Sequence, residues 1–199
     1  QRPVMRVSRD GGRSYPASRQ RPLAQRLPSQ PAAVPTWRAD GTTCLVVCDL
    51  DTKLGDVTAD SDALVAAITQ AGGRALVDQS PTGGRHVYLL LAQPVSNPDV
   101  DAVMDGLASQ FTSLDPQPMR SIASGLIRPP GSPHKRGGHQ QLLTPWDEAL
   151  DILHHPNPAT VLQSLAERYP APPRAVPPAD DTALIKGPSK PLTGRWAVV

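Results

Sequence analysis

The sequence has 199 residues, which is enough for one good hydrophobic core with at most a small second lobe. Its formal net charge is a modest +2, from 20 basic and 18 acidic residues. No apolar run approaches the roughly 18 residues that a membrane-spanning helix needs, and nothing resembles a signal peptide. We therefore expect a cytoplasmic protein with no membrane contact. The first residue is Gln rather than Met, so we also expect a piece of a longer protein.

The first segment, residues 1–36, is rich in proline and arginine, and we expect it to be a basic arm. Residues 1–38 contain a single acid, Asp10, against eight arginines. These are Arg2, Arg6, Arg9, Arg13, Arg19, Arg21, Arg26 and Arg38. Such an arm is suited to follow a phosphate backbone, and a solvated flexible arm is the alternative. We expect one folded domain over residues 37–169 and a proline-rich linker over 170–199 that leads to a further module.

The stretch CLVVCDLDTK, residues 44–53, predicts a buried strand that ends in two acids. Because side chains alternate along a strand, Asp49 and Asp51 share one face, roughly 6–7 Å apart. Burial of unpaired charge is costly, so this pair of carboxylates requires a partner that offsets their repulsion.

The rest of the chain alternates between helices and strands, which predicts an α/β or α+β domain with a mixed sheet and flanking helices. The first expected helix, residues 60–73, has an Asp/Ser cap and stops at two glycines, and the helix over 97–111 has Asn97 as its cap and Pro98 at its first position. The other expected elements are strands over 74–80 and 85–92, a strand–basic loop–strand over 123–143, and helices over 144–155 and 156–169.

The stretch SPTGGRHVYLLL, residues 80–91, places polar groups around a tight turn before a strand. Two glycines, including Gly84, let the backbone turn sharply and approach a ligand closely. The Ser80 hydroxyl, the Arg85 guanidinium, the His86 imidazole and the turn amides are groups that bind phosphate oxygens. An ordinary hairpin with polar ends is the alternative.

The stretch IRPPGSPHKRGGHQQLL, residues 127–143, predicts a cationic loop. Arg128, His134, Lys135 and Arg136 crowd a segment that three prolines stiffen, which lowers the entropy lost when a ligand is bound. Residues 120–146 contain no acid, whereas ordinary surfaces mix charges of both signs, so a solvated surface loop is the less favoured alternative.

These stretches, in this order, resemble the archaeo-eukaryotic primase superfamily, and within it the bifunctional primase–polymerase (Prim-Pol) domain of phage and plasmid replication proteins. The resemblance covers roughly residues 37–145. It implies a primase-like catalytic domain in a bacterial host cell that makes and extends DNA primers, with two Mg²⁺ or Mn²⁺ ions as cofactors. It also implies a single-stranded DNA template, dNTP or NTP substrates, and a helicase domain C-terminal to this chain.

Matched position by position, the resemblance implies roles for individual residues. The catalytic, metal-binding acids are Asp49, Asp51 and Asp115; the nucleotide is bound by Ser80, Gly84, Arg85, His86, Ser132, His134 and Lys135; and nucleic acid is bound by Arg128 and Arg136. The pattern departs from the family at Asp115, because Pro116 and Pro118 crowd an acid that relatives carry within a clear strand. Asp101 and Asp105 are competing positions, but we expect them on the exposed face of a helix.

Three other classes of protein also fit part of the pattern. A haloacid-dehalogenase-type phosphatase starts with a similar acid pair, but requires a threonine where this chain has Lys53. A metal-dependent glycosyltransferase explains the acid pair alone. A non-catalytic origin-binding or single-stranded-DNA-binding initiation module would use the basic arm, but has no need of clustered acids.

Overall fold

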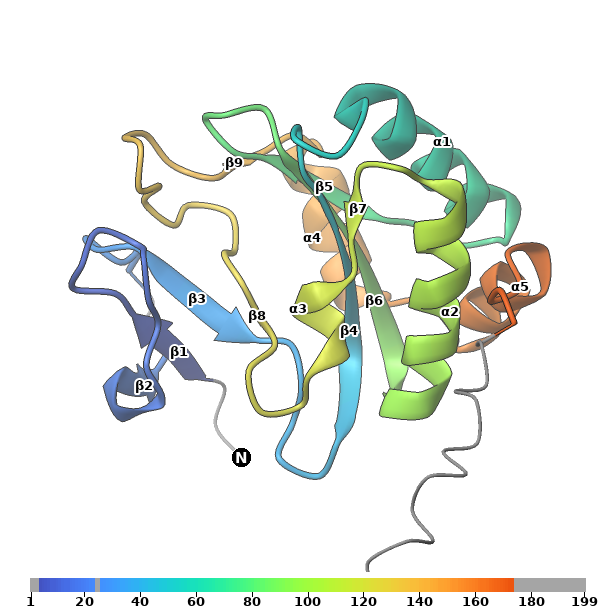
Figure 1. The fold of residues 1–199 in the computed structure, drawn as a ribbon, viewed down its shortest axis with the longest axis horizontal. Helices are drawn as coiled ribbons and strands as arrows, with labels where there is room; N and C mark the ends of the chain where they lie inside the picture. Colours follow the sequence, from blue (N-terminus) through green and yellow to red (C-terminus); the bar gives the residue numbers. More distant parts are fainter. Residues whose placement is uncertain (1–3, 24–25, 174–199) are drawn as a thin grey trace, which may run out of the picture.

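The computed structural model describes residues 4–23 and 26–173, which form two β-sheets with helices packed around the larger one (Figure 1). The smaller sheet has the order β2-β1-β3-β8, with strands β1 (Val4–Val7), β2 (Gln20–Pro22), β3 (Ala32–Pro35) and β8 (Leu126–Ile127). The larger sheet has the order β7-β4-β6-β5-β9, with strands β4 (Thr42–Leu50), β5 (Leu76–Gln79), β6 (Arg85–Ser96), β7 (Leu114–Asp115) and β9 (Gln141–Leu142). The helices are η1 (Ala17–Arg19), α1 (Val57–Gln70), α2 (Asn97–Gln110), α3 (Gln117–Arg120), α4 (Trp146–His154) and α5 (Thr160–Arg168).

The α+β class is confirmed, but all the pairings between these strands are antiparallel, so the expected mixed sheet is wrong. The crossover through α1 does make β5 run parallel to β4. However, β6 returns from the β5–β6 hairpin and lies between them, so β4 and β5 are not neighbours.

The hydrophobic core lies between the larger sheet and its helices. α1 and α2 pack against β4 and β6 (Figure 1), and α5 packs against both helices. Leu64 of α1, Met104 of α2 and Ile152 of α4 are fully buried, and Val47 and Leu50 of β4 have no exposed surface. Among the described residues, no helix is both long and apolar enough to cross a membrane.

The helix starts differ from the expected ones by a few residues. α1 begins at Val57, because the Asp56 side chain accepts hydrogen bonds from the Thr58 and Ala59 amides, both at 3.1 Å. It ends as expected, with Gly72 at φ +78°. α2 begins at Asn97 itself, with Ser96 before it as the cap.

The expected N-terminal arm is wrong for its described part, because residues 4–23 and 26–35 contain strands β1 to β3. Met5 and Val7 alternate with outward residues and are buried, together with Ala32 and Ala33. Proline does not prevent this sheet from forming. Pro22, which has no backbone N–H, lies at the end of the edge strand β2, where one missing hydrogen bond between strands costs little. The division of the chain into domains stays a prediction, and most of the expected linker (174–199) lies outside the described residues.

Candidate functional site

Four charged or ionisable side chains form a row across four neighbouring strands of the larger sheet. Asp115 on β7 is the register partner of Asp49 on β4, Asp49 is that of His86 on β6, and His86 is that of Asp78 on β5. Directly opposite residues of antiparallel strands point to the same face. The row therefore gathers three carboxylates and one imidazole on one side of the sheet.

The third acid, Asp115, lies in a strand despite its neighbouring prolines. β7 is only two residues long, so Pro116 follows it and opens the turn into α3. The Asp51 amide donates to the Ser113 carbonyl at 2.8 Å, which holds the start of β7 beside the end of β4. Asp49, Asp51 and Asp115 are thus brought to one corner of the sheet.

Asp49 is partly buried, with 29% of its side chain exposed. Burial raises the pKa of Asp49 above its ordinary value, and the nearby charges of Asp115 and Asp51 raise it further. His86 and Arg128 act in the opposite direction. The net effect of burial and of these charges is to disfavour the ionised form of Asp49.

His86 is buried, with 4% of its surface exposed, and its two ring nitrogens have different partners. Nε2 lies 3.4 Å from Asp49 Oδ1, whereas Nδ1 lies 2.9 Å from Asp78 Oδ1 and 3.0 Å from the Tyr88 hydroxyl. The rings of His86 and Tyr88 meet edge to face at 5.7 Å between centroids. Only the Nε2 side of the ring is directed toward the acid pair.

A cavity of about 260 Å³ lies over the ends of β4 and β6. It is lined by Asp49, Leu50, Asp51, Thr52, Lys53, Ser80, Thr82, Gly84, His86, Arg128, His134, Lys135 and Arg136. Two of the three acids and the cations of the loop thus line the same cavity, whereas Asp115 lies beside it as the register partner of Asp49. The Arg128 Nε atom is buried and, among the described residues, has no hydrogen-bond partner.

The turn before β6 has the expected tight geometry. Gly83 has φ +90°, its amide donates to the Ser80 carbonyl at 3.0 Å, and the Ser80 amide donates to the Gly84 carbonyl at 2.8 Å. A Cβ on Gly84 would lie 3.1 Å from the Leu50 carbonyl oxygen, so a larger residue would crowd the end of β4. The Ser80 side chain faces the same cavity as the acids.

The loop between β8 and β9, which Figure 1 shows as an extended segment between the two sheets, contributes Arg128, His134, Lys135 and Arg136 to the lining of the cavity. Its turn is closed by the His134 amide, which donates to the Gly138 carbonyl at 2.9 Å, and Gly137 and Gly138 both have positive φ. Burial lowers the pKa of His134, and the adjacent charges of Arg128, Lys135 and Arg136 lower it further. The loop thus concentrates positive charge that its own residues do not neutralise.

Two residues that we expected to bind the nucleotide, Arg85 and Ser132, do not line the cavity, which corrects that expectation. Arg85 turns toward α1, where its guanidinium contacts Gln79 at 3.2 Å and Asp62 at 3.3 Å. Ser132 is buried, and its hydroxyl both donates to the Ala32 carbonyl at 2.7 Å and accepts from the Ala32 amide at 3.0 Å. Ser132 therefore fastens the loop to β3 and does not line the cavity.

Comparison with known proteins identifies the fold. No family model matches the sequence, and no curated protein matches it. The structure is similar to the archaeo-eukaryotic primase (AEP) domain of the cyanophage S-2L primase-polymerase, with a TM-score of 0.54 and 18% identity over 82% of this chain and 89% of that one. The chain has the primase–polymerase fold. The polymerase domain of Mycobacterium tuberculosis Ligase D, solved in complex with DNA, matches with a TM-score of 0.46 and 19% identity over 83% of this chain and 81% of that chain.

In this primase–polymerase fold, the three acids have the donor chemistry of a site for divalent cations. Carboxylate oxygens are the ligands that Mg²⁺ prefers, and the burial that raises the pKa of Asp49, together with the charges of Asp115 and Asp51, is a cost that a bound cation would offset. Backbone amides already fix one oxygen of each flanking acid, since Lys53 donates to Asp51 at 2.9 Å and Gln117 to Asp115 at 3.0 Å. Within the described ranges, no three His, Cys, Asp or Glu side chains are grouped tightly enough to hold one ion together.

Sequence reasoning missed three polar residues behind His86. Asp78, Tyr88 and Gln140 are buried, with 0%, 5% and 2% of their surfaces exposed, and all three contact the His86 ring. An acid in the short expected strand over 74–80 was a signal, but only the register with β6 shows that Asp78 faces inward.

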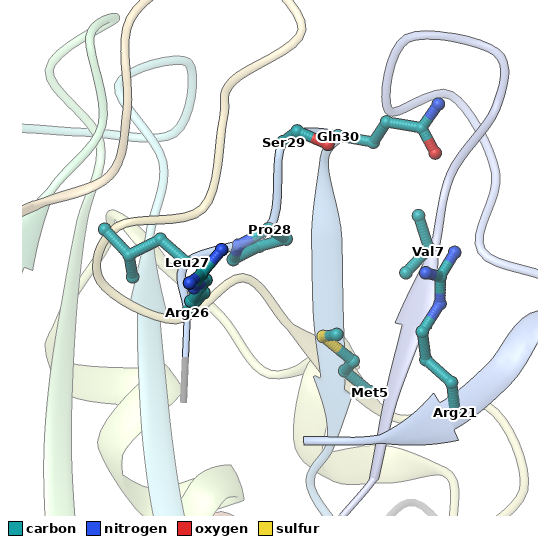
Figure 2. A pocket seen from close by; sticks show the side chains of 8 residues that line it. All are labelled: Met5, Val7, Arg21, Arg26, Leu27, Pro28, Ser29 and Gln30. Atoms are coloured by element: carbon teal, nitrogen blue, oxygen red, sulfur yellow. The ribbon is translucent and has the colours of Figure 1, made fainter. Parts of the chain in front are cut away.

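A second hollow, of about 220 Å³, lies in the N-terminal sheet (Figure 2). Met5 and Val7 of β1 and Arg21 of β2 line one side, and the segment from Arg26 to Gln30 lines the other. Arg21 and Arg26 are both exposed, so this sheet presents cations to solvent beside a small apolar floor.

Proposed function

We propose that the protein is a DNA-dependent primase and polymerase, a nucleotidyltransferase that makes primers and extends them on single-stranded DNA. The observation that carries the proposal is the cavity in which an acidic corner faces a cationic loop. A nucleoside triphosphate with its divalent cations has the complementary charges on both sides. The buried Arg128 Nε atom, which has no partner among the described residues, supports an anionic ligand at this position.

Asp49, Asp51 and Asp115 would hold two Mg²⁺ or Mn²⁺ ions in this proposal. The ions would supply activation of the attacking 3′-oxygen and neutralisation of the leaving pyrophosphate. The protein's own contribution is to bring the acids together on adjacent strands, which it does through the β4–β7 register pair and the hydrogen bond from Asp51 to Ser113. In the absence of ions, these carboxylates repel one another.

The triphosphate would be bound by the groups that face the acids across the cavity. His86 presents Nε2, the Ser80 turn presents its side-chain hydroxyl, and Arg128 and Lys135 present cations. His86 would bind phosphate oxygens in its doubly protonated form, in which Nε2–H faces the cavity and can donate to them while Nδ1–H is held by the protein. Arg85 and Ser132 are left out of this group, because their contacts lie elsewhere.

The template would lie along the cationic surface outside the cavity. Arg136, at the cavity edge, and the exposed Arg21 and Arg26 of the N-terminal sheet are suited to phosphate contacts without base recognition. The remaining parts of the proposal are a phage or plasmid replication role in the bacterial cytoplasm and a helicase domain beyond the C-terminal end of this chain.

A primer-extension assay tests the proposal. The protein is incubated with primed and unprimed single-stranded DNA, labelled dNTPs or NTPs, and Mg²⁺, Mn²⁺ or a chelator. We expect incorporation that requires a divalent ion and is lost when Asp49 and Asp51 are both changed to Asn. DNA binding with no ion-dependent incorporation under any of these conditions would contradict the proposal and favour a non-catalytic DNA-binding module.

A further inference from the structure

The His86 ring is enclosed on its Nδ1 side by three polar side chains from three different segments. Asp78 is on β5, Tyr88 is on β6, and Gln140 is at the end of the cationic loop. None of these three residues lines the cavity. They therefore do not contact a ligand in the cavity, but each of them contacts the His86 ring.

The hydrogen bonds of this group can be assigned from its donors and acceptors. The Tyr88 hydroxyl donates to Asp78 Oδ2 at 2.6 Å, and Gln140 Nε2 donates to Asp78 Oδ1 at 2.8 Å. Burial raises the pKa of Tyr88 well above its ordinary value, so its hydroxyl keeps its hydrogen. Asp78 accepts both bonds and the His86 amide at 3.3 Å, which satisfies a carboxylate that has no exposed surface.

These assignments determine which ring nitrogen of His86 carries a hydrogen. The nearest neighbours of Nδ1 are two acceptors, Asp78 Oδ1 at 2.9 Å and the Tyr88 oxygen at 3.0 Å, whereas the Gln140 amide nitrogen is farther away at 3.3 Å. Nδ1 therefore carries a hydrogen and donates it. A hydrogen bond from Nδ1–H fixes the orientation of the ring, and with it the direction in which Nε2 points, in both the neutral and the doubly protonated imidazole.

We propose that Asp78 is a positioning residue that, with Tyr88 and Gln140, holds the His86 ring with Nδ1–H turned into the protein and Nε2 turned into the cavity. The inference rests on the proposed function for its consequence, which is that triphosphate binding depends on a carboxylate that does not touch the triphosphate. Residues that orient a ligand-binding histidine typically change affinity by about 10- to 100-fold when they are altered.

The first experiment does not depend on the proposed function. Two-bond ¹H–¹⁵N correlation spectra of the ligand-free wild-type protein distinguish a protonated ring nitrogen from a bare one. The chain has five histidines, and the signals of His86 are those that disappear in His86→Gln. We expect a protonated Nδ1 at neutral pH. A bare Nδ1 with the hydrogen on Nε2 would overturn the inference, whether or not the protein binds nucleotides.

The second experiment is a double-mutant cycle on dGTP binding with Mg²⁺ and no DNA. We expect Asp78→Asn to weaken binding by about tenfold in the wild-type background and by less than about twofold in the His86→Gln background. Tyr88→Phe, which removes one oxygen atom, should give a smaller loss with the same dependence on His86. Equal losses in both backgrounds would show that Asp78 does not act through His86.

A control separates positioning from a general loss of stability. Asn157 is equally buried, with 5% of its surface exposed, and its side chain hydrogen-bonds the backbone of Arg74 and Leu90 away from the cavity. Asn157→Ala should lower the melting temperature and leave dGTP affinity within about twofold. If the wild-type protein bound no dGTP, the proposed function would be lost, and the spectra would still decide the orientation of His86.

Discussion

Asp49 and Asp115 lie directly opposite each other on antiparallel neighbouring strands, although 65 residues of sequence separate them. Like charges in this position destabilise a sheet, and within residues 4–23 and 26–173 the one basic side chain that contacts Asp49 is His86, whose Nε2 lies 3.4 Å from Asp49 Oδ1. The fold therefore maintains a repulsion in its ligand-free state that a bound cation would remove. Such a cost is typical of a binding site and unusual for a purely structural pair.

Changing Asp49 to Asn should stabilise the ligand-free protein while removing activity. Because the folded-state pKa of Asp49 is raised above 3.8, its favourable contribution is present below pH 3.8 and is lost as the pH rises through the folded-state pKa. We therefore expect the melting temperature of the Asn variant to exceed that of the wild type by a few degrees at pH 7 and to approach it near pH 3.8. Primer extension should fall by at least about 10²-fold. An Asn variant that is less stable at pH 7 would contradict the repulsion.

Two neighbouring arginines should differ in their effect on nucleotide binding. Arg128→Ala removes a half-buried cation from the cavity, and we expect dNTP affinity to fall by about tenfold, as for other charge-assisted contacts. Arg85→Ala is the matched control, because its guanidinium contacts Gln79 and Asp62, and it should leave dNTP affinity within about twofold. Both affinities are measured by calorimetry with Mg²⁺. If Arg85→Ala lowered dNTP affinity as much as Arg128→Ala does, Arg85 would have to be counted among the nucleotide-binding residues.

Acidification should weaken the folded state through His134. Its folded-state pKa lies below 6.5 because of burial and of the cations Arg128, Lys135 and Arg136, so its contribution to stability is present above pH 6.5 and lost as the pH falls through the folded-state pKa. We expect the melting temperature to drop more between pH 7.5 and 5 in the wild type than in His134→Gln. Thermal scans without ligand measure this difference. An equal drop in both proteins would exclude His134 as its source.

Removing the Ser132 hydroxyl should loosen the attachment of the cationic loop to β3. Ser132→Ala leaves the buried Ala32 amide and carbonyl without their side-chain partner, and we expect the free energy of unfolding to fall by about 1–3 kcal/mol in urea titrations. The control is Ser121→Ala. The Ser121 hydroxyl accepts one exposed hydrogen bond, from the Ser124 amide at 3.2 Å, and its removal should lower the free energy of unfolding by less than about 0.5 kcal/mol. Similar losses for both variants would argue against the attachment.

The exposed arginines of the N-terminal sheet should contribute to DNA binding through phosphates alone. For an Arg21→Ala/Arg26→Ala double variant, we expect weaker binding to single-stranded DNA of any sequence and a salt dependence that is shallower by about 0.7 per lost phosphate contact. Mg²⁺-dependent dNTP binding, measured without DNA, should be unchanged. A loss of dNTP binding in the same variant would show instead that this sheet is required for the cavity itself.

The sequence predicted the proximity of Asp49 and Asp51 and the turn before His86, because strand alternation and two adjacent glycines are local signals. Asp115 was assigned only through the family resemblance, because its pairing with Asp49 joins distant strands. The N-terminal sheet was missed because its buried positions, such as Met5 and Ala32, are few and are interspersed with arginines and prolines. Asp78 was missed for a different reason. From sequence alone, a single acid in a short strand is expected to face solvent, and only the pairing with β6 shows that Asp78 faces His86.

The loop that carries the cations spans both sheets, because it leaves β8 of the smaller sheet and enters β9 of the larger one. Ser132 fastens the first part of the loop to Ala32 of β3, and Gln140 fastens its end to Asp78 of β5. A shift of one sheet against the other would therefore move the cations relative to Asp49. Substitutions at Ser132 or Gln140 would change the spacing of charges in the cavity, although neither residue lines it.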